Sequence, residues 1–266
     1  MKIGFMQGRM VKPLHAQIQE FPSKHWEEEL VYAKKLNFQI IEWVLDKKSI
    51  KTNPFLFNHD YVNKILHENN IVIGSVSDDF FLQHERSDIL SGKILEHMER
   101  VFMKMSQLKT SLYVLPLLEK MTLKNLEIKN QIHIFEQIQK IVPKNIKICI
   151  ESDLNSENIK MLFNSIDKNI FKINYDIGNS AYEGYNFQNE FDDYFDLIEN
   201  IHIKDRLFQG KTVPLGEGDA SITNVLKELK KLNYEKNLIL QAARIPGMKD
   251  KDVMIKYKTF VENAIL

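Results

Sequence analysis

The sequence contains a single cysteine, Cys149, among its 266 residues. One cysteine excludes a disulfide framework within the chain, and such sparing use is typical of a reducing compartment. Cys149 stands in the apolar stretch IKICIES, where we expect a small buried side chain. Glycine and proline are also few, with 10 and 7 residues scattered along the chain. Their scatter gives no sign of a linker, a low-complexity tract or a domain boundary.

Long hydrophobic runs and an excess of one charge are missing as well. No apolar stretch reaches the ~18 residues of a membrane-spanning helix, and the opening MKIGFMQGRM lacks the apolar centre of a signal peptide. Lysine plus arginine and aspartate plus glutamate both number 36, so the formal net charge is zero. Without a basic excess, the chain has no general attraction for nucleic acid or an anionic membrane. We therefore expect a soluble, cytoplasmic protein.

What the sequence does contain is a regular alternation of two patterns. Short apolar runs rich in isoleucine and valine occupy residues 2–6, 38–44, 71–77, 111–116, 146–151, 171–176, 200–204 and 237–241. Longer segments with helical spacing lie between them, among them residues 26–36, 94–108, 222–232 and 253–266. Plausible helix N-caps are Ser156, Asn189 and Ser221.

Alternating strands and helices indicate βαβ units, with a parallel sheet covered by helices. Eight repeats in 266 residues predict a (β/α)₈ TIM barrel that spans residues 1–266 as a single domain. A doubly wound open sheet is the alternative. Such a sheet usually carries a glycine-rich phosphate loop after its first strand, and GFMQGRM is not the G-x-G-x-x-G pattern.

Four successive strands in the second half of the chain end in polar residues, namely Glu151, Asp176, His202 and Gln241. In a barrel the C-terminal strand ends surround one mouth, where active sites lie. The first two separations, 25 and 26 residues, match one repeat each, and the third, 39 residues, leaves room for an insertion. Taken alone, a carboxylate at a strand end is most often a helix cap or a salt-bridge partner, a histidine is more often a core residue than a ligand, and a glutamine indicates little. Together, two carboxylates, an imidazole and an amide oxygen favour a site for Mn²⁺, Co²⁺, Zn²⁺ or Mg²⁺.

The order of several segments resembles the sugar phosphate isomerase/epimerase family built on the xylose-isomerase-like barrel. The segments are IGFMQGRM, FPSKHWEEELVYAKKLNFQIIEW, GSVSDDFF, ESD, NYDIGNS, HIKDR and VPLGEGDAS, which together cover nearly the whole chain. The family includes ketose 3-epimerases, hydroxypyruvate isomerase, inosose dehydratase and, more distantly, endonuclease IV. The resemblance implies that Glu151, Asp176 and His202 are three of four metal ligands. Gln241 then stands where the fourth ligand is usually a glutamate.

The resemblance further implies a metal-dependent enzyme that isomerises or epimerises a sugar or sugar phosphate. Glu151 would be ligand and base, with proton transfer through a metal-stabilised enediolate. The 3-epimerases use a second glutamate, and the amide oxygen of Gln241 is too weakly basic to replace it. Gln241 is therefore expected in the catalytic site as a ligand or substrate contact. One-base isomerisation, dehydration of a sugar acid or cyclitol, and sugar binding without catalysis remain open readings.

Five further residues are expected to contact the substrate: Glu42, Lys204, Arg206, Glu217 and Arg244. The cations among them favour an anionic substrate, such as a sugar phosphate or an acid sugar, because guanidinium and ammonium groups bind such anions. The alternative is that they pair with neighbouring carboxylates. Glu42, at the end of its run, would contact substrate hydroxyls or form a structural salt bridge.

The expected partner is a small carbohydrate rather than a nucleic acid or a membrane. A DNA enzyme related to endonuclease IV would need three zinc ions, many more ligands and a basic face. The chain has only eight histidines and no net charge, which argues against it. Trp43 and the pair Phe80–Phe81 are expected to form an apolar wall against a sugar. Barrels of this kind often dimerise, so a homodimer is among the expectations.

Overall fold

The computed structural model describes residues 1–14, 19–89 and 91–265. Within them, eight parallel strands close into a barrel in the order β1-β10-β7-β6-β5-β4-β3-β2. The barrel strands are β1 (Lys2–Met6), β2 (Ile40–Leu45), β3 (Val72–Asp78), β4 (Leu112–Leu117), β5 (Lys147–Ser152), β6 (Phe171–Asp176), β7 (Ile198–Ile203) and β10 (Asn237–Leu240). Each apolar run of the sequence overlaps one of them. The predicted (β/α)₈ TIM barrel is therefore confirmed.

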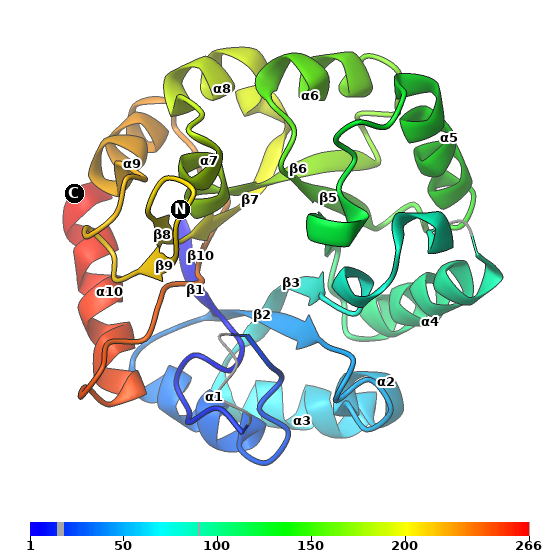
Figure 1. Ribbon diagram of the computed structural model, residues 1–266. Coiled ribbons are helices and arrows are strands. Elements are labelled where there is room, and N and C mark those ends of the chain that lie inside the picture. Colours follow the sequence, from blue (N-terminus) through cyan, green and yellow to red (C-terminus); the bar gives the residue numbers. More distant parts are fainter. Residues whose placement is uncertain (15–18, 90, 266) are drawn as a thin grey trace.

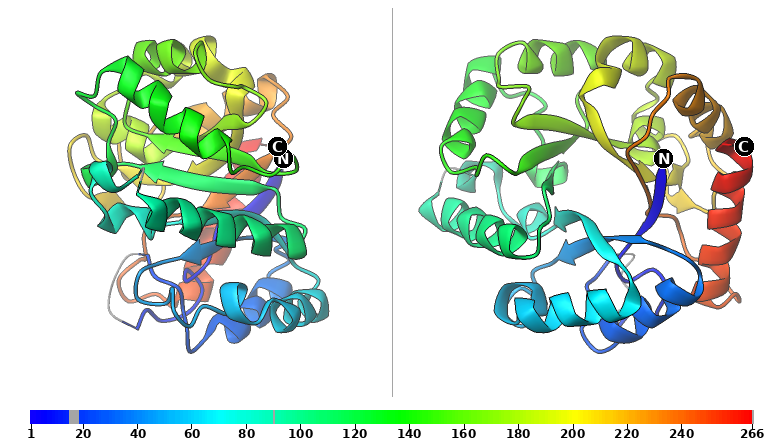
Figure 2. Two further views of the ribbon diagram at one scale, coloured as in Figure 1. Left: turned by 90° about the vertical axis from the view of Figure 1, so that its right-hand side faces the viewer. Right: turned by 180° about the vertical axis from the view of Figure 1, so that it is seen from behind.

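Helices surround the strands on the outside of the barrel (Figure 1), and Figure 2 shows the same ring from the side and from behind. They are α1 (Trp26–Lys35), α2 (Pro54–Phe57), α3 (His59–Asn69), α4 (Gly92–Gln107), α5 (Ile128–Gln139), α6 (Ser156–Phe163), α7 (Ile177–Glu183), α8 (Phe187–Tyr194), α9 (Ile222–Lys231) and α10 (Asp250–Ile265). Short 3₁₀ turns are η1 (Phe81–Gln83), η2 (Arg86–Asp88), η3 (Glu119–Met121) and η4 (Phe195–Leu197), and β8 (Asp205–Arg206) and β9 (Thr212–Val213) form a small separate sheet.

The helices form where the apolar spacing predicts them, although two of the three expected N-caps are wrong. In α9 the buried residues Ile222, Val225, Leu226 and Leu229 recur every three or four positions, so one face packs on the barrel. The side chains that cap α6 and α8 belong to Asn155 and Asn186 instead of the predicted Ser156 and Asn189. Ser221 does precede α9, without a hydrogen bond from its side chain.

The main apolar core lies between the strands and the surrounding helices. Two smaller clusters are separate from it, one of Met6, Ile40, Val44 and Ile239, the other of Leu112, Val114 and Cys149. Their residues alternate along the strands with residues of the main core, so they face the barrel interior. Cys149 is buried as predicted, and burial raises the pKa of its thiol.

Because all barrel strands are parallel, their C-terminal ends surround a single mouth. Asp176 at the end of β6 is in register with His202 of β7. Leu240 of β10 is in register with Ile203 of β7, which places Gln241 one residue beyond the paired strands. Strands β5, β6, β7 and β10 are also neighbours in the barrel order. The register therefore brings the predicted ligands to one rim.

The long interval between β7 and β10 contains the predicted insertion, built around β8 and β9. Asp205 is 1% exposed, and its carboxylate accepts hydrogen bonds from the backbone N–H groups of Gly216, Gly218 and Ala220 at 2.8, 3.1 and 3.2 Å. A buried carboxylate that accepts several N–H groups fixes the path of a loop. Asp205 therefore serves the loop rather than the mouth of the barrel.

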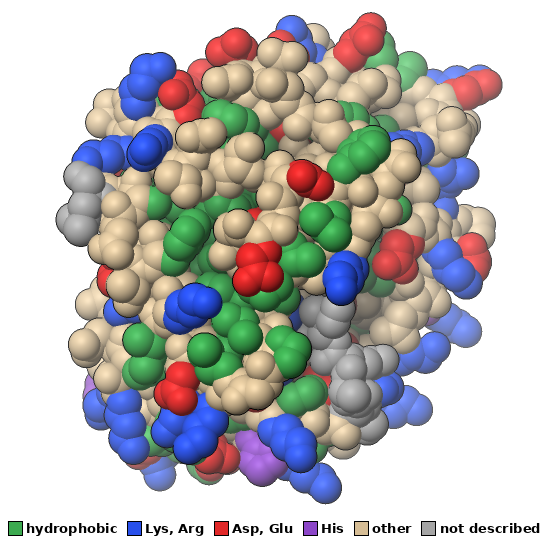
Figure 3. All heavy atoms as spheres, turned by 60° about the vertical axis from the view of Figure 1, so that its left-hand side comes forward, with side chains coloured by type: hydrophobic (Ala, Val, Ile, Leu, Met, Phe, Trp, Pro, Cys, Tyr) green, Lys and Arg blue, Asp and Glu red, His purple; other side chains and the backbone are tan. Residues whose placement is uncertain are grey.

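The outer surface carries charges of both signs. On the face shown in Figure 3, hydrophobic side chains gather near the centre, and positive and negative side chains are interspersed around them. Across the described residues, no helix is both long enough and apolar enough to cross a membrane.

Candidate metal centre and substrate cavity

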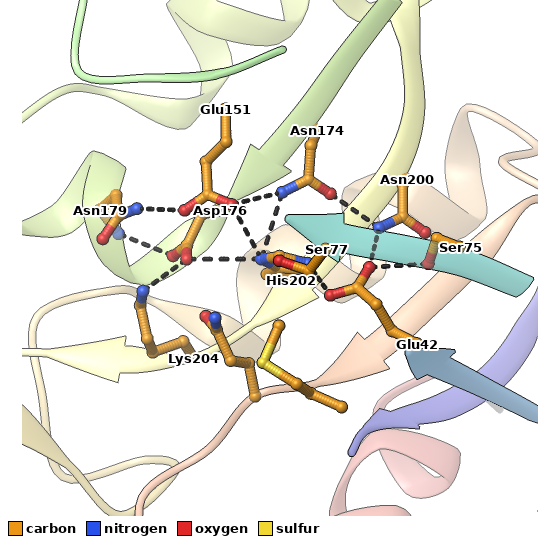
Figure 4. A network of polar contacts seen from close by, with 12 residues as sticks. Glu42, Ser75, Ser77, Glu151, Asn174, Asp176, Asn179, Asn200, His202 and Lys204 are labelled. Carbon is orange, nitrogen blue, oxygen red and sulfur yellow. Dashed lines mark hydrogen bonds and ion pairs between the residues drawn. The ribbon is translucent and has the colours of Figure 1, made fainter. Parts of the chain in front are cut away.

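Three of the predicted ligands meet at the mouth of the barrel. Glu151 of β5, Asp176 of β6 and His202 of β7 offer ligand atoms that all lie within 4.8 Å of one another. Nδ1 of His202 is 3.2 Å from Oε2 of Glu151 and 3.7 Å from Oδ2 of Asp176 (Figure 4). The three side chains are buried, with exposed fractions of 5%, 4% and 0%. Two carboxylates and an imidazole nitrogen at such separations suit a divalent cation.

Gln241, directly after β10, has an amide oxygen that fits the same purpose. Its side chain is buried, and its Nε2 donates a hydrogen bond to Oε1 of Gln19 at 2.8 Å. Its Oε1 is buried and has no hydrogen-bond partner within the described part of the chain. A buried polar atom without a partner is costly, and a bound cation would satisfy it. Gln241 lines the same cavity as Glu151, so the donor set of this rim fits a divalent metal.

Glu42 of β2 orients the imidazole from inside the barrel. The carboxylate is fully buried, and its Oε1 lies 2.7 Å from Nε2 of His202. Its Oε2 accepts hydrogen bonds from Oγ of Ser75 at 2.7 Å and from Nδ2 of Asn200 at 3.0 Å. These contacts correspond to the structural salt bridge, the alternative to contact with substrate hydroxyls that the sequence left open. Glu42 leaves Nδ1 of His202 facing the other ligands, as partners of metal-bound histidines do.

The protonation of His202 reflects two opposing influences. Burial lowers the pKa of its imidazole. The carboxylates of Glu42 and Glu151 outweigh burial, so the pKa of His202 lies well above its usual range. Only the neutral ring is a metal ligand, so a metal ion would have to compete with a proton for His202.

Two asparagines that were not among the predicted residues connect the ligands. Nδ2 of Asn174 donates a hydrogen bond to Oε2 of Glu151 at 2.9 Å and lies 3.1 Å from Nδ1 of His202. Nδ2 of Asn200 donates to Oδ1 of Asn174 at 2.7 Å. Each asparagine stands two residues before a ligand on its own strand, and residues i and i+2 share one face. This two-residue spacing could have identified both asparagines from the sequence as neighbours of the ligands.

Asp176 is held between the barrel and α7. Its Oδ1 accepts the backbone N–H of Asn179 at 2.8 Å, which caps α7, and its Oδ2 lies 2.5 Å from Nζ of Lys204. Burial raises the pKa of Asp176, but Lys204 and His202 outweigh burial and lower the pKa to about 2. Asn179 also donates from Nδ2 to Oε1 of Glu151 at 2.8 Å. The charge of Lys204 is therefore matched by a ligand rather than free for a substrate anion.

A cavity of about 930 Å³, called here the mouth cavity, opens at this rim. Its size falls within the ~300–1,000 Å³ of small-molecule sites. Its charged lining residues are Asp46, Asp79, Glu119, Glu151, Asp153 and Glu183, with Lys47, Lys48, Lys204 and Arg206. Gln19, Asn179, Tyr182 and Gln241 add neutral polar groups. Such a lining offers many hydrogen bonds to a small hydroxylated molecule.

Of the remaining predicted contacts, only Arg206 reaches the mouth cavity. Its Nη1 donates to Oδ1 of Asn179 at 3.2 Å, and its guanidinium carbon lies 4.0 Å from the ring centroid of Tyr182. Arg244 pairs with Asp250 and does not line the cavity. Glu217 is exposed and lies outside it as well.

The expected apolar wall is not at the site. Trp43 is fully buried among aromatic rings, and its Nε1 donates to Oδ1 of Asn53 at 3.0 Å. Phe81 is also fully buried, and the ring of Phe80 lies 4.5 Å from that of His97. None of the three lines the mouth cavity.

Asp79, which the sequence reading passed over, does line the mouth cavity. Oγ of Ser77 donates to its Oδ1 at 2.9 Å, and Nε2 of Gln19 donates to its Oδ2. Burial raises the pKa of Asp79 to about 7, and the charge of Glu151 adds to this effect. Asp79 directly follows β3, just as Gln241 directly follows β10. Its position after a strand could therefore have identified it as a candidate site residue.

Comparison with known proteins agrees with this architecture. A family model described as the xylose isomerase-like TIM barrel matches residues 30–252. A search of the curated proteins found no match. Among solved structures, the IolI protein with a bound zinc atom is 15% identical with a TM-score of 0.76, over 100% of this chain and 98% of that one.

Two other similar structures have different printed activities. The 3-keto-D-glucoside 4-epimerase YcjR from E. coli is 14% identical with a TM-score of 0.70, over 97% of this chain and 99% of that one. The probable 3-DHS dehydratase AsbF from Bacillus anthracis is 15% identical with a TM-score of 0.70, over 99% of both chains. At such identities the likeness shows the fold. Because the family model covers most of the sequence, the chain belongs to the xylose isomerase-like TIM barrel family.

Proposed function

We propose that the protein, residues 1–266 acting as one catalytic domain, is a divalent-metal-dependent isomerase or epimerase of a small sugar or sugar derivative. The observation that carries the proposal is the cluster of Glu151, Asp176 and His202, whose ligand atoms lie within 4.8 Å of one another at the barrel mouth. The zinc of the IolI structure and the epimerase activity named for YcjR support it. Proteins with this fold catalyse several types of reaction, so the reaction of this protein has to be inferred from the residues of its site.

The metal would be held by Glu151, Asp176, Nδ1 of His202 and Oε1 of Gln241. A bound Mn²⁺, Co²⁺, Zn²⁺ or Mg²⁺ would polarise an oxygen of the substrate. Glu42 supports the set by fixing His202 at 2.7 Å. Such supporting partners typically change metal affinity about 10- to 100-fold.

Glu151 is the base in this proposal. Asn179 donates to its Oε1 at 2.8 Å and Asn174 to its Oε2 at 2.9 Å, so both carboxylate oxygens are oriented. The carboxylate also lines the mouth cavity, where it would remove a proton from the carbon beside a substrate carbonyl. Gln241 is a ligand or hydrogen-bonding group, because an amide does not accept a proton at neutral pH.

The lining of the mouth cavity favours a polyhydroxylated substrate without a large negative charge. Six carboxylates and four cations line it, and Lys204 is already paired with Asp176. A phosphate would have to be held by Lys47, Lys48 or Arg206, because Arg244 lies outside the cavity. Matched pairs of free and phosphorylated sugars would test this preference directly.

Dehydration of a sugar acid or cyclitol is the second candidate. A single base with an acid is sufficient for loss of water, and Gln241 leaves the rim with one oriented carboxylate base, Glu151. The printed name of AsbF, a probable dehydratase with the same fold, is in keeping with this candidate. A sugar-binding barrel without catalysis is the third.

Metal content tests the proposal first. We expect the dialysed wild-type protein to retain about one equivalent of metal and the His202→Ala variant to lose it. The control is His133→Ala, because His133 is 55% exposed on α5, away from the mouth. The proposed four-ligand site is wrong if the wild-type protein holds no metal and if added Mn²⁺, Co²⁺, Zn²⁺ or Mg²⁺ does not raise its Tm.

Incubation with a panel of sugars in D₂O then identifies the reaction. An isomerase or epimerase places deuterium on a substrate carbon, and Glu151→Gln should abolish this exchange. Release of water with a new double bond or ketone would identify a dehydratase. Tight binding without exchange would identify a binding protein.

A further inference from the structure

Glu151 is joined in the mouth cavity by five other carboxylates, and four of these have structural roles or are exposed. Asp46 accepts backbone N–H groups at 2.6 and 2.8 Å. Asp153 accepts a threonine hydroxyl at 2.7 Å, and Glu183 pairs with a lysine at 2.6 Å. Glu119 is exposed at the rim. The fifth carboxylate, Asp79, has only neutral hydrogen-bond partners among the residues that the structure describes, namely Ser77 and Gln19.

Those partners connect Asp79 to the candidate ligands. Nε2 of Gln241 donates to Oε1 of Gln19, and Nε2 of Gln19 donates to Oδ2 of Asp79. The amide of Gln19 is thereby fixed, with its oxygen toward Gln241 and its nitrogen toward Asp79. The hydroxyl of Ser77 lies 2.9 Å from the other oxygen of Asp79, and a hydroxyl can donate to a carboxylate or accept from a carboxylic acid. Both protonation states of Asp79 can therefore be accommodated.

The charges that act on Asp79 come from three sides of the barrel. Glu42 of β2 and Glu151 of β5 raise its pKa, and Arg9, after β1, attracts its charged form. Burial is the largest influence, and together these effects raise the pKa of Asp79 to about 7. A group with a pKa near the working pH is suited to give and take a proton.

We propose that Asp79 is the acid that acts together with Glu151, delivering a proton to the substrate carbonyl oxygen as Glu151 removes one from the adjacent carbon. This inference rests on the proposed function and narrows it to isomerisation between neighbouring carbons. Both carboxyl groups line the same cavity, and Gln241 is not basic enough to be a second base.

The proton transfers balance without an added reactant. In the first step the C–H bond breaks, its proton joins Glu151, and its electron pair forms a carbon–carbon double bond. The carbonyl oxygen takes the proton of Asp79, which gives an enediol. In the second step Glu151 returns its proton to the former carbonyl carbon, and Asp79 takes the proton of the hydroxyl on the other carbon. The carbonyl has moved by one carbon, and both carboxyl groups have recovered their starting states.

A titration that needs no substrate tests the inference first. The carboxyl carbon signals of ¹³C-aspartate-labelled full-length protein are followed against pH, with and without added Mg²⁺, and Asp79→Asn assigns the signal of Asp79. We expect a midpoint near pH 7, and Asp153→Asn should leave this signal in place. A midpoint near pH 4 in both conditions would overturn the inference, since the group would then hold no proton to deliver.

Kinetics with a sugar that the wild type converts provide the second test. Asp79→Asn should lower kcat by about 10²- to 10⁴-fold, as for other acid–base groups, while metal content stays unchanged. The fall of kcat/KM above about pH 7 should disappear in this variant, and Asp79→Glu should restore part of the rate. An Asp79→Asn variant within threefold of wild type, with the same pH profile, would overturn the inference.

The two proposals fail in different ways. Absence of metal and of any solvent exchange in the wild type would contradict the proposed function. In that event, the carboxyl titration still decides whether Asp79 is an acid at neutral pH. Retained metal and Glu151-dependent exchange, with Asp79→Asn unaffected, would contradict the role of Asp79 alone.

Discussion

Neutral amide side chains position many of the charged residues at the barrel mouth. Asn174 and Asn179 donate to Glu151, Asn200 donates to Glu42, and Gln19 donates to Asp79. An amide donates hydrogen bonds without carrying charge, so it orients a carboxylate without neutralising it. Glu151 can therefore be held rigidly and still act as a base.

The position of Gln241 leads to a prediction about Gln241→Glu. A carboxylate cannot donate to Gln19, so the Gln19 amide must turn and its hydrogen bond to Asp79 is lost. Without metal, we expect the free energy of unfolding to fall by about 1–3 kcal/mol, the usual cost of an unpaired buried polar group. With metal, the added negative ligand should tighten binding. Melting curves with and without Mn²⁺ would measure both effects.

The control for this substitution is Gln139→Glu, at the exposed end of α5. It adds the same charge far from the mouth and should change neither curve. A Gln241→Glu variant that melts like wild type without metal would show that the hydrogen bond to Gln19 contributes little. Weaker metal binding in the variant would remove Gln241 from the ligand set.

How far the sequence predicts the site depends on where each residue stands. Glu151, Asp176 and His202 could be found because each lies at the end of a recognisable strand. Gln19 could not, because it lies in the long segment between β1 and α1, whose path no periodicity describes. Glu217 and Arg244 lie outside the mouth cavity for a similar reason: they belong to loops after strands, and nearness in sequence does not set the direction of a loop.

At the scale of elements, the eight barrel strands could be predicted from the sequence, but the two-residue strands and the short helix α7 could not. Buried parallel strands are continuous apolar runs, and those runs mark all eight barrel strands. Strands β8 and β9 have two residues each, too few to leave a pattern. Helix α7 begins at Ile177 within NYDIGNS, whose glycine and asparagines are typical of a loop. Gly178 is explained only by packing, since a Cβ there would lie 2.9 Å from the side chain of Lys204.

Helix α1 is tied to the loop after β1 by a buried acid, which makes stability depend on pH. Glu29 is fully buried, and its two oxygens accept the backbone N–H groups of Gly8 and Met10 at 2.8 and 2.9 Å. Burial raises the pKa of Glu29 to about 7, although these two hydrogen bonds lower it. The folded protein therefore holds a proton here at pH values where the unfolded chain, with a pKa near 4.5, has lost it.

The sign of the effect follows from this difference. The stabilisation of the folded state by the proton on Glu29 is fully present below about pH 4.5 and is lost as pH rises through about 7. Glu29→Gln removes the titration, so relative to wild type the variant should gain up to about 3 kcal/mol between pH 4.5 and 8. Urea unfolding at several pH values, with Glu27→Gln on the same helix as control, measures the difference. If the free energies of unfolding of Glu29→Gln and wild type differ by the same amount at every pH in this range, the prediction is wrong.

At the scale of the whole molecule, the candidate metal site joins separate parts of the chain. Its residues come from β5, β6, β7 and the segment after β10, so one ion would connect four successive positions around the barrel. A ligand that binds only the folded state stabilises it by about 2.7 kcal/mol at 100 times its Kd. For a chain of this size we expect Tm to rise by roughly 5–10 °C.

Differential scanning fluorimetry with increasing metal would test this expectation. The rise should grow with the logarithm of metal concentration and should be absent in His202→Ala. A rise of equal size in that variant would indicate that the metal binds elsewhere.

The pairing of β1 with β10 also has a consequence for how the protein is made. Lys2 is in register with Asn237, so β1 lacks one of its two neighbours until β10, the last of the eight barrel strands along the chain, has been made. Until then the sheet has two open edges, whose free N–H and C=O groups can pair with other chains. A product truncated before residue 237 keeps both edges and should aggregate. Translation must therefore pass β10 before pairing within the barrel can cover both edges.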